Sequence, residues 1–377
     1  MPNRLTPLQR GQVRILFIPF VYTKGSERVS QLIKIMSRHY DVVGLKPKRR
    51  GRQTYRGRKA VYVTEYLLEK IVLILKGIRI GLQNHVNLIF CEEPEYALPG
   101  LIISKILRKP VIYDSHGNRY LLCMRLNPPF YYRLYIRSLD TMLAKMCSLL
   151  LVVSEHNKRY YVYQGVPPES IRILPSCIDL NEVDNAREGS LKYLKLFKGK
   201  KTLLFLGNFA YQPNVEALRF INNELAPAIE HKDNVDIYIS GYSSVPIQRL
   251  TGCILHRKVT YLGFVPNVYE VLHAADAFVC PLWSTVGIIV KMLDAMAVGK
   301  PIVTTSLLKE GIPELNECNV LLARDKSEFI RLVVDLLEHY DKYAYMGSSL
   351  HRIIVTKYSE EIVEKQLCSV IYDIVSR

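Results

Sequence analysis

The sequence has few of the features that mark a membrane-spanning protein or a small domain stabilised by metal ions or disulfides. Its eight cysteines form no C-x-x-C pair and its histidines do not cluster, which argues against a structural zinc site. Charged residues such as Lys76 and Lys105 interrupt the apolar runs before any could span a bilayer. The polar segment Met1–Arg10 lacks the apolar core of a signal peptide. We therefore expect reduced thiols in a cytosolic setting.

Three nucleotide and ester-hydrolysis motifs are also missing from the sequence. Neither half of the chain contains G-x-G-x-x-G, G-x-x-x-x-G-K-[ST] or G-x-S-x-G. These motifs place backbone N–H groups or a nucleophile at the end of a strand. Their absence disfavours a dehydrogenase, a P-loop NTPase and an α/β-hydrolase.

The charge of the chain is divided unevenly. Residues 1–180 contain 29 Lys and Arg against 12 Asp and Glu, whereas residues 181–377 contain 22 against 23. The segment Lys46–Lys59 alone has eight cations and no acid. This pattern indicates either a surface tuned for solubility or an anionic partner, and cations mixed with aromatic residues suit both a membrane surface and nucleic acid.

Strand and helix patterns alternate along the chain and then start again. Apolar runs such as Val13–Phe20 and Thr202–Leu206 read as buried parallel strands, and Glu27–Ser37 has a helical period. The 377 residues, 49% of them apolar, suffice for two such domains. We expect an α/β fold of two doubly wound domains, joined near 178–201, with ligands at the carboxyl ends of the strands and a cleft between the facing sheets.

The stretch 279–305 is the most informative part of the sequence. A strand ending at Pro281, a loop to Gly287 and a helix from Ile288 to about Val298 predict an anion site at a helix N-terminus. Lys291 and Asp294 share one face of this helix. They suit the diphosphate and ribose of a nucleotide, although a surface ion pair would have the same spacing.

This stretch closely resembles the retaining glycosyltransferases of the GT-B fold. The letters DAMAVGKPIV, beginning at Asp294, are similar to the family's "EAMA-x-GKPVV", while the family's first acidic position falls on Val286. Tyr261–Val265 and the segment GNFAYQPN at 207–214 are similar to two further loops of the family. The resemblance implies a GT-B fold of two Rossmann-like domains facing across a cleft and assigns Asp294 to the ribose.

The same resemblance implies further donor-binding residues. It assigns the following residues to the nucleotide-sugar: Gly25, Asn208, Gly263, Phe264, Val265, Gly287, Ile288, Lys291 and Asp294. Relatives use an Arg and a Lys near the positions of Asn208 and Pro213, so Lys291 is the substitute cation for the diphosphate. The implied domains are 1–178 for the acceptor, 179–355 for the donor and a C-terminal helix, 356–377, that packs back on the first domain.

In the N-terminal half, His116 directly follows the strand pattern Val111–Tyr113. The resemblance assigns it to the donor sugar, and an imidazole there can stay neutral at cytosolic pH; the alternative is a histidine that caps the next loop. Arg28 and Glu92 are candidates for contacts with the acceptor or the membrane, and either could be an ordinary surface residue. The basic residues assigned to the membrane are Lys48, Arg49, Arg50 and Arg52.

The resemblance implies a transferase that moves a sugar from a nucleotide-sugar to a lipid-linked or polysaccharide acceptor with retention of configuration. His116 and Lys291 are its candidate catalytic residues. Because D-x-D is absent, we expect no metal and no other cofactor. We expect a peripheral protein at the cytoplasmic face of an anionic membrane, with nucleic acid as the less favoured partner. The alternatives are a nucleotide-sugar 2-epimerase and a degenerate GT-B protein that binds nucleic acid or another partner through its basic half.

Overall fold

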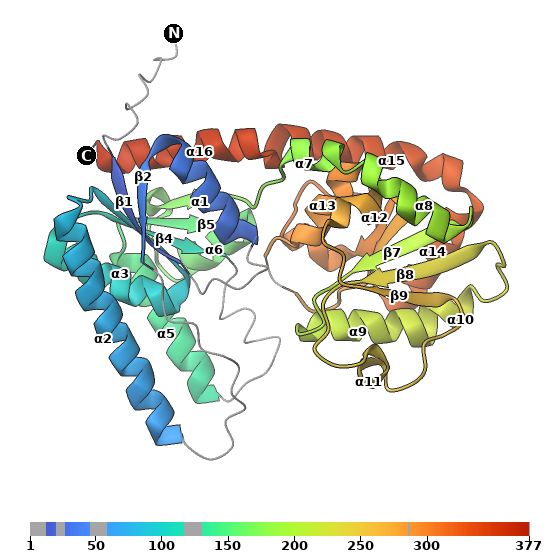
Figure 1. Ribbon diagram of the computed structural model, residues 1–377, viewed down its shortest axis with the longest axis horizontal. Coiled ribbons are helices and arrows are strands. Elements are labelled where there is room, and N and C mark those ends of the chain that lie inside the picture. The colour runs from blue at the N-terminus through green and yellow to red at the C-terminus, as the bar shows by residue number, and fades with distance from the viewer. Residues whose placement is uncertain (1–12, 20–26, 46–58, 117–129, 286, 377) are drawn as a thin grey trace, which may run out of the picture. The chain divides into compact units, whose positions relative to one another are not determined.

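The computed structural model describes residues 13–19, 27–45, 59–116, 130–285 and 287–376 (Figure 1). The chain divides into two compact units, which we call the N-terminal unit (Met1–Pro175 with Glu364–Arg377) and the C-terminal unit (Ser176–Val363). Each unit contains one six-stranded sheet flanked by helices. The prediction of two doubly wound α/β domains is confirmed.

The N-terminal sheet is parallel throughout, in the order β2-β1-β3-β4-β5-β6. Its strands are β1 (Arg14–Ile18), β2 (Asp41–Gly44), β3 (Leu88–Glu92), β4 (Val111–Ser115), β5 (Leu149–Val152) and β6 (Ile171–Ile173). The strand order reverses direction between β1 and β3, and ligands of such sheets bind beside the switch at the carboxyl ends of the strands. The register pairs Glu92 with Asp114 at this edge.

Helices cover both faces of the N-terminal sheet. They are α1 (Glu27–His39), α2 (Lys59–Gln83), α3 (Glu93–Leu107), α5 (Phe130–Met146), α6 (Glu155–Tyr163), the 3-10 turn η1 (Pro168–Ser170) and α16 (Glu360–Val375). Leu73 of α2, Leu101 of α3 and Leu143 of α5 share one core with Leu16 and Ile89 of the sheet. These three helices therefore form a layer on one face, and α1 lies on the other (Figure 1).

Two glycines hold α2 close to α3. A Cβ at Gly77 would overlap the side chain of Ile103, and a Cβ at Gly81 would overlap that of Leu107. Helix axes can approach closely where one helix presents glycine to the side chains of the other. The side of α2 that faces α3 and the sheet is therefore fixed, and its opposite side points away from the core.

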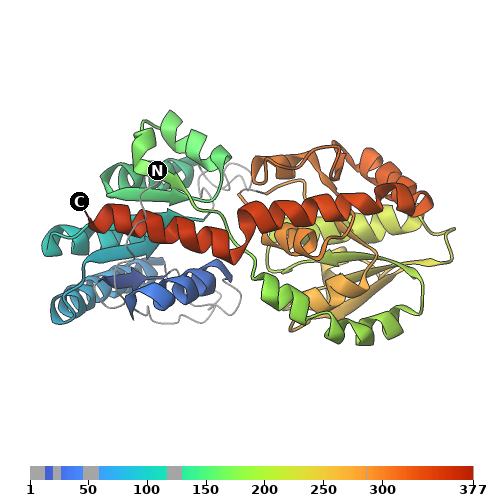
Figure 2. The same cartoon turned by 90° about the horizontal axis from the view of Figure 1, so that it is seen from above.

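The end of the chain packs on the N-terminal unit. Glu364 of α16 accepts a hydrogen bond from Arg38 at 2.6 Å and lies 2.6 Å from His39 Nε2. Tyr40 donates to the carbonyl of Cys368 at 3.4 Å. Figure 2 shows α16 running beside α1. Among the described residues, no helix has both the length and the apolarity needed to cross a bilayer.

The C-terminal sheet is also parallel, in the order β12-β11-β10-β7-β8-β9. Its strands are β7 (Lys201–Leu206), β8 (Val235–Ser240), β9 (Val259–Gly263), β10 (Ala277–Cys280), β11 (Ile302–Thr305) and β12 (Leu321–Ala323). The order reverses between β7 and β10. The loops after these two strands therefore mark the expected ligand edge of this sheet.

The helices of the C-terminal unit complete a single large core. They are α7 (Leu180–Asn185), α8 (Leu191–Phe197), α9 (Gln212–Phe220), α10 (Ala226–Ala228), α11 (Ile247–Thr251), α12 (Val268–Ala274), α13 (Val290–Val298), α14 (Lys326–Glu338) and α15 (Tyr340–Ile353). Shorter turns are η2 (Glu188–Ser190), η3 (Ile221–Leu225), η4 (Ser306–Glu310) and η5 (Ile354–Tyr358). Helix α13 follows β10 and begins two residues later than its sequence pattern predicts.

Candidate active site

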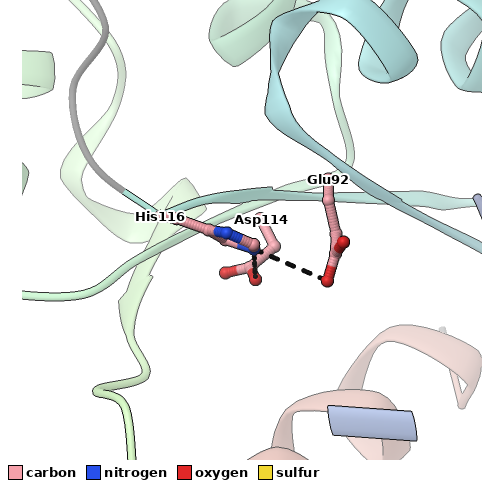
Figure 3. Close-up of side chains that lie close together, drawn as sticks. All are labelled: Glu92, Asp114 and His116. Carbon is pink, nitrogen blue, oxygen red and sulfur yellow. Dashed lines mark ion pairs between the residues drawn. The ribbon is translucent and has the colours of Figure 1, made fainter. Parts of the chain in front are cut away.

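A buried cluster of charged side chains occupies the switch edge of the N-terminal sheet. Glu92 ends β3, and Asp114 and His116 lie at the end of β4 (Figure 3). The Nε2 atom of His116 is 3.0 Å from Asp114 Oδ2 and 3.5 Å from Glu92 Oε1. Its Nδ1 atom is 3.8 Å from Glu93 Oε1. The two carboxylates that His116 Nε2 contacts are fully buried, whereas the imidazole is 21% exposed, so the ring can be reached from solvent.

Arg28 of α1 is a second cation that contacts Asp114. Its Nε donates to Asp114 Oδ2 at 3.0 Å and its Nη2 to Oδ1 at 2.8 Å, which is the bidentate geometry that guanidinium favours. Nη2 also donates to the carbonyl of Leu174 at 2.9 Å. Arg28 is buried, at 7% exposure, so it is not the ordinary surface residue that the sequence left open. Its predicted role toward an acceptor stays a prediction.

The carboxylates of this cluster favour the protonated form of His116. Burial by itself lowers the pKa of the imidazole, but Asp114 and the two glutamates outweigh burial and raise it to about 10. Burial likewise would raise the pKa of Asp114, and Arg28 and His116 together hold it well below its usual range. These contacts therefore favour the cationic form of His116 at neutral pH, whereas the sequence was compatible with a neutral imidazole.

The geometry of the cluster also bears on metal binding. Ligand atoms of Glu92, Asp114 and His116 lie within 4.8 Å of one another, which is close enough for a shared cation. Both oxygens of Asp114, however, already accept hydrogen bonds from Arg28. A divalent ion would have to displace or sit beside these cations, and like charges repel strongly in a buried site. The carboxylates of Glu92 and Asp114 therefore suit the cations Arg28 and His116 better than they suit a metal ion.

A second buried polar network supports the loop that carries His116. Asp140 of α5 accepts hydrogen bonds from Tyr113 at 2.6 Å and from Tyr161 at 2.8 Å. The phenol of Tyr161 is also 2.9 Å from the hydroxyl of Ser115. Burial raises the pKa of Asp140 to about 6, although the two phenols oppose this rise. The network joins α5 and α6 to the residue that precedes His116.

In the C-terminal unit, Lys291 lies at the switch edge of the sheet. Its Nζ donates to the carbonyl of Leu206 at 2.6 Å and to Asn214 Oδ1 at 2.6 Å. The ammonium also lies 4.3 Å from the ring centroid of Phe205. Burial lowers the pKa of Lys291 to about 8. A lysine from the first turn of α13 therefore places its charge where β7 ends.

Asp294 lies one turn further along α13 and is buried, at 6% exposure. Its Oδ1 accepts a hydrogen bond from the phenol of Tyr269 in α12 at 2.9 Å. Lys291, by contrast, bonds to Leu206 and Asn214. Lys291 and Asp294 therefore do not form the surface ion pair that their spacing in the sequence allowed. The assignment of Asp294 to a ribose stays a prediction.

Glycines shape the loops at this edge. A Cβ at Gly241 would overlap the carbonyl oxygen of Gly207, and a Cβ at Gly311 would overlap that of Gly287. Gly287 also has φ 76°, in the left-handed region that favours glycine. Only the lack of side chains lets these backbone segments approach so closely.

The other predicted donor residues lie at or just after the ends of strands, or just before α13. Asn208 follows β7, and its Oδ1 accepts from the backbone N–H of Ala210 at 3.0 Å. Gly263 ends β9 with φ 74°, and its carbonyl accepts from Ser240 and from the N–H of Gly241, both at 2.9 Å. Phe264 is 69% exposed, whereas Val265 is buried. Ile288 is half-buried in the loop before α13. Their roles toward a donor stay predictions.

Several predicted positions lie outside the described residues. They are Gly25, Lys48, Arg49, Arg50, Arg52 and Val286.

Sequence patterns gave no role to some residues that the structure places in these clusters. Asp114 interrupts a strand of apolar residues, and a carboxylate in such a strand indicates a buried charge that needs a partner. Asn214 ends the segment GNFAYQPN, but the resemblance of that segment did not predict its contact with Lys291. Tyr269 gave no signal of its own, because its partner Asp294 comes from another helix.

Comparisons with known proteins agree with this architecture. Residues 200–339 match the family model described as Glycosyl transferases group 1. The structure is similar to HepE from Anabaena in complex with UDP and glucose, with a TM-score of 0.73 and 15% identity over 96% of this chain and 100% of that one. Sucrose-phosphate synthase from Thermosynechococcus elongatus gives a TM-score of 0.76 and 15% identity over 96% and 99% of the two chains.

A third solved structure is less similar. It is a protein from Listeria monocytogenes described as a UDP-N-acetylglucosamine 2-epimerase, with a TM-score of 0.63 and 11% identity over 96% of each chain. No curated protein matches the sequence. The resemblance indicated by the sequence motifs is confirmed: residues 200–339 match group 1 glycosyl transferases, and the chain has the fold of the GT-B glycosyltransferases.

Proposed function

We propose that the protein is a glycosyltransferase that uses a nucleotide-sugar donor. The match of residues 200–339 to group 1 glycosyl transferases carries this proposal, because it covers every donor residue that we assign to the C-terminal unit. Uridine nucleotides are the first donors to test, since HepE, which has the same fold, has been solved with UDP and UDP-glucose. Lys291 and Asp294 are the residues to which we assign the diphosphate and the ribose.

The charges at the edge of the C-terminal sheet support departure of a nucleoside diphosphate. Transfer of a sugar leaves negative charge on the diphosphate, and preorganised cations and backbone dipoles lower the barrier by stabilising it. Lys291 provides the cation, and the first turn of α13 provides backbone N–H groups just after Gly287. Asn214 and the carbonyl of Leu206 fix the position of the ammonium before a donor binds.

For the N-terminal unit, we assign His116 to a hydroxyl of the donor sugar. A protonated imidazole held by Asp114 and Glu92 donates hydrogen bonds and cannot act as a base. Such a hydrogen bond orients the sugar, while the negative charge of the reaction develops on the diphosphate. Retention of anomeric configuration and independence from metal ions complete the proposed reaction. Activity that persists in a chelator tests the second point.

The acceptor and the location form a second part of the proposal. The excess of cations over residues 1–180 supports a lipid-linked or polysaccharide acceptor at an anionic membrane surface on the cytoplasmic side. Arg28 and Glu92 are buried at the edge of the N-terminal sheet. A role for Glu92 toward an acceptor hydroxyl therefore needs a ligand that enters the His116 cluster.

The experiment is a donor screen with the purified full chain. We expect release of nucleoside diphosphate from at least one of a panel of UDP- and GDP-sugars, and loss of most of this release in the His116→Ala variant. The variant Leu194→Ala, in an exposed position of α8, is the matched control and keeps wild-type activity.

Two other outcomes would redirect the assignment. Conversion of UDP-N-acetylglucosamine into its 2-epimer without an acceptor would indicate an epimerase, the class of the Listeria protein. Failure to bind or turn over any donor, together with polynucleotide binding, would indicate a degenerate protein that acts through its basic half.

A further inference from the structure

The layer formed by α2, α3 and α5 carries an unusual amount of exposed apolar surface. Among the described residues, 26 large apolar side chains are exposed, and 14 of them belong to these three helices. The 14 are Leu68, Ile71, Val72, Leu75, Leu82, Leu98, Ile102, Ile106, Phe130, Tyr131, Leu134, Tyr135, Met142 and Met146. We call this set the apolar face. Scattered exposed apolar residues are ordinary, but a concentration on one layer marks an interaction site.

The apolar face follows the helical period on each helix. On α2, exposed residues recur at Leu68, Ile71, Leu75 and Leu82, which lie on one side of a helix with 3.6 residues per turn. The buried residues Leu73, Gly77 and Gly81 lie on the opposite side, against α3 and the sheet. Helix α2 therefore has two apolar sides, and only one of them is used by the fold.

Helices α3 and α5 repeat this arrangement. Ile102 and Ile106 of α3 are exposed on the side opposite to Gly100 and Ser104, which are buried. On α5, Leu134, Tyr135 and Met142 are exposed opposite to the buried Ile136, Asp140 and Leu143. Because all three helices bury their inner sides in one core on the same face of the sheet, their outer sides point away from it together (Figure 1).

The charges on this layer have one sign. The exposed charged residues of the described parts of the three helices are Lys76, Arg79, Lys105 and Lys145, with Arg108 and Lys109 directly after α3. Among the same described side chains, no carboxylate is exposed to a comparable degree: Asp140 is buried, and Glu69 and Glu95 are partly covered. The surface therefore combines aliphatic side chains with cations.

A hollow of about 650 Å³ lies beside α5 and is lined by residues of this helix together with Gln164, which follows α6. Leu134, Met142 and Met146 supply an apolar lining, and Arg137 and Lys145 lie beside them. Such a lining offers aliphatic contact for hydrocarbon and cations for a phosphate at one place.

We propose that the outer side of α2, α3 and α5 docks onto the surface of an anionic lipid bilayer, with the apolar face entering the region between headgroups and acyl chains. The inference deepens the proposed function and rests on it for the presence of a lipid-linked acceptor. It places the contact on folded helices, in addition to the basic segment 46–59. Docking of this kind needs aliphatic side chains for the acyl region and cations for lipid phosphate, and both are present.

The same observations disfavour the other occupants. Nucleic acid uses cations and aromatic rings, and it offers no apolar phase for the Leu, Ile, Val and Met side chains that make up most of the apolar face. A second copy of the chain would bring Lys76, Arg79 and Lys105 against identical cations, which costs free energy. A bilayer that contains anionic lipid satisfies both kinds of side chain at once.

The test is sedimentation of the full chain with lipid vesicles in the absence of any sugar donor. We expect binding to vesicles of phosphatidylcholine mixed with phosphatidylglycerol, and weaker binding to phosphatidylcholine alone. The double variant Ile71→Glu with Leu75→Glu should lose at least about tenfold in binding, since two exposed aliphatic side chains become charged. Its matched control is Leu191→Glu with Leu194→Glu, on two exposed leucines of α8, which should bind as wild type.

The contribution of charge is measured with a second variant. Lys76→Gln with Arg79→Gln should weaken binding to the anionic vesicles by about fivefold for each cation, and this difference should shrink at high salt. Binding to phosphatidylcholine alone should change little.

The depth of insertion can be read from fluorescence. The chain has a single tryptophan, Trp283, in the C-terminal unit. Lipids brominated on their acyl chains should quench the indole introduced by Leu75→Trp and leave the emission of Trp283 unchanged. Circular dichroism checks that each variant is folded.

Several results would overturn the proposal. They are wild-type binding of the Ile71→Glu and Leu75→Glu double variant, no binding of the wild type to anionic vesicles, and a dimer in solution that the same double variant dissociates. Donor turnover is measured separately with soluble substrates. The docking proposal can therefore fail while the transferase stays active, or hold for a protein without transferase activity.

Discussion

Arg28 and Asp114 form a bidentate ion pair in the core of the N-terminal unit, although 86 residues separate them in the sequence. Both side chains are buried, at 7% and 0% exposure. His116 lies 3.0 Å from the same carboxylate, so one aspartate holds two cations. The pair thereby links the start of α1 to the end of β4 and fixes the residue we assign to the donor sugar.

Removing Arg28 should destabilise the protein strongly. In Arg28→Met the Asp114 carboxylate stays buried and loses its bidentate partner, and breaking a buried pair in this way costs about 3–5 kcal/mol. Chemical denaturation, followed by circular dichroism, measures the change in unfolding free energy.

The control for Arg28→Met is Arg159→Met on α6, whose ion pair with Glu155 is exposed. Surface pairs of this kind contribute about 0–1 kcal/mol. Equal stability of the two variants would contradict a structural role for the buried pair.

His116 should stabilise the protein in a pH-dependent way. Its pKa in the folded protein is raised from 6.5 to about 10, so its favourable interaction is fully present below about pH 6.5 and is lost as the pH rises toward 10. The difference in unfolding free energy between the wild type and His116→Gln should therefore be largest in mildly acidic solution and shrink through the alkaline range. Denaturation at several pH values measures it.

NMR gives an independent check of the same state. The imidazole signal of His116 should not titrate around neutral pH. A midpoint near the ordinary histidine value for His116 would show that Asp114 and Glu92 do not hold the proton.

Asp294 should matter for donor affinity more than for folding. Loss of a hydrogen bond to a charged group costs about 1.5–3 kcal/mol, so Asp294→Asn should weaken binding of the donor about ten- to a hundredfold. Isothermal titration with the donor found in the screen measures this.

Tyr269→Phe is the matched variant, because it removes the phenol that donates to Asp294 and leaves the carboxylate in place. We expect it to bind the donor within a few fold of wild type. If Asp294→Asn binds the donor as tightly as Tyr269→Phe and the wild type, the ribose assignment is wrong.

Lys291 should make donor binding depend on pH. Because its pKa is lowered to about 8, the side chain is charged at neutral pH and neutral in more alkaline solution. The dissociation constant of the donor should be constant below about pH 7 and then rise, approaching tenfold for each pH unit if a single proton is required.

Lys291→Arg provides the comparison, since guanidinium stays charged throughout this range. The variant should bind the donor with little dependence on pH, even if its affinity is lower. A wild-type affinity that does not change through pH 8 to 9 would exclude Lys291 as the cation that holds the diphosphate.

The sequence by itself determined the two α/β units and the order of the elements around Asp294. Buried parallel strands are rich in Leu, Ile and Val, and this local signal can be read without knowledge of the fold. The stretch around Asp294 was equally informative, because a loop, a glycine and the following helix are close together in the chain. Lys291 and Asp294 could thus be placed on one helix before their partners were known.

Only the tertiary structure decided which charges meet. Arg28, Glu92 and His116 come from three different elements and gather around Asp114 because parallel strands end at one edge of the sheet. Their proximity sets the protonation of His116, which no spacing in the sequence reveals. The apolar face also needed the structure, since the periodicity of α2, α3 and α5 shows apolar residues but not which side of each helix the core leaves uncovered.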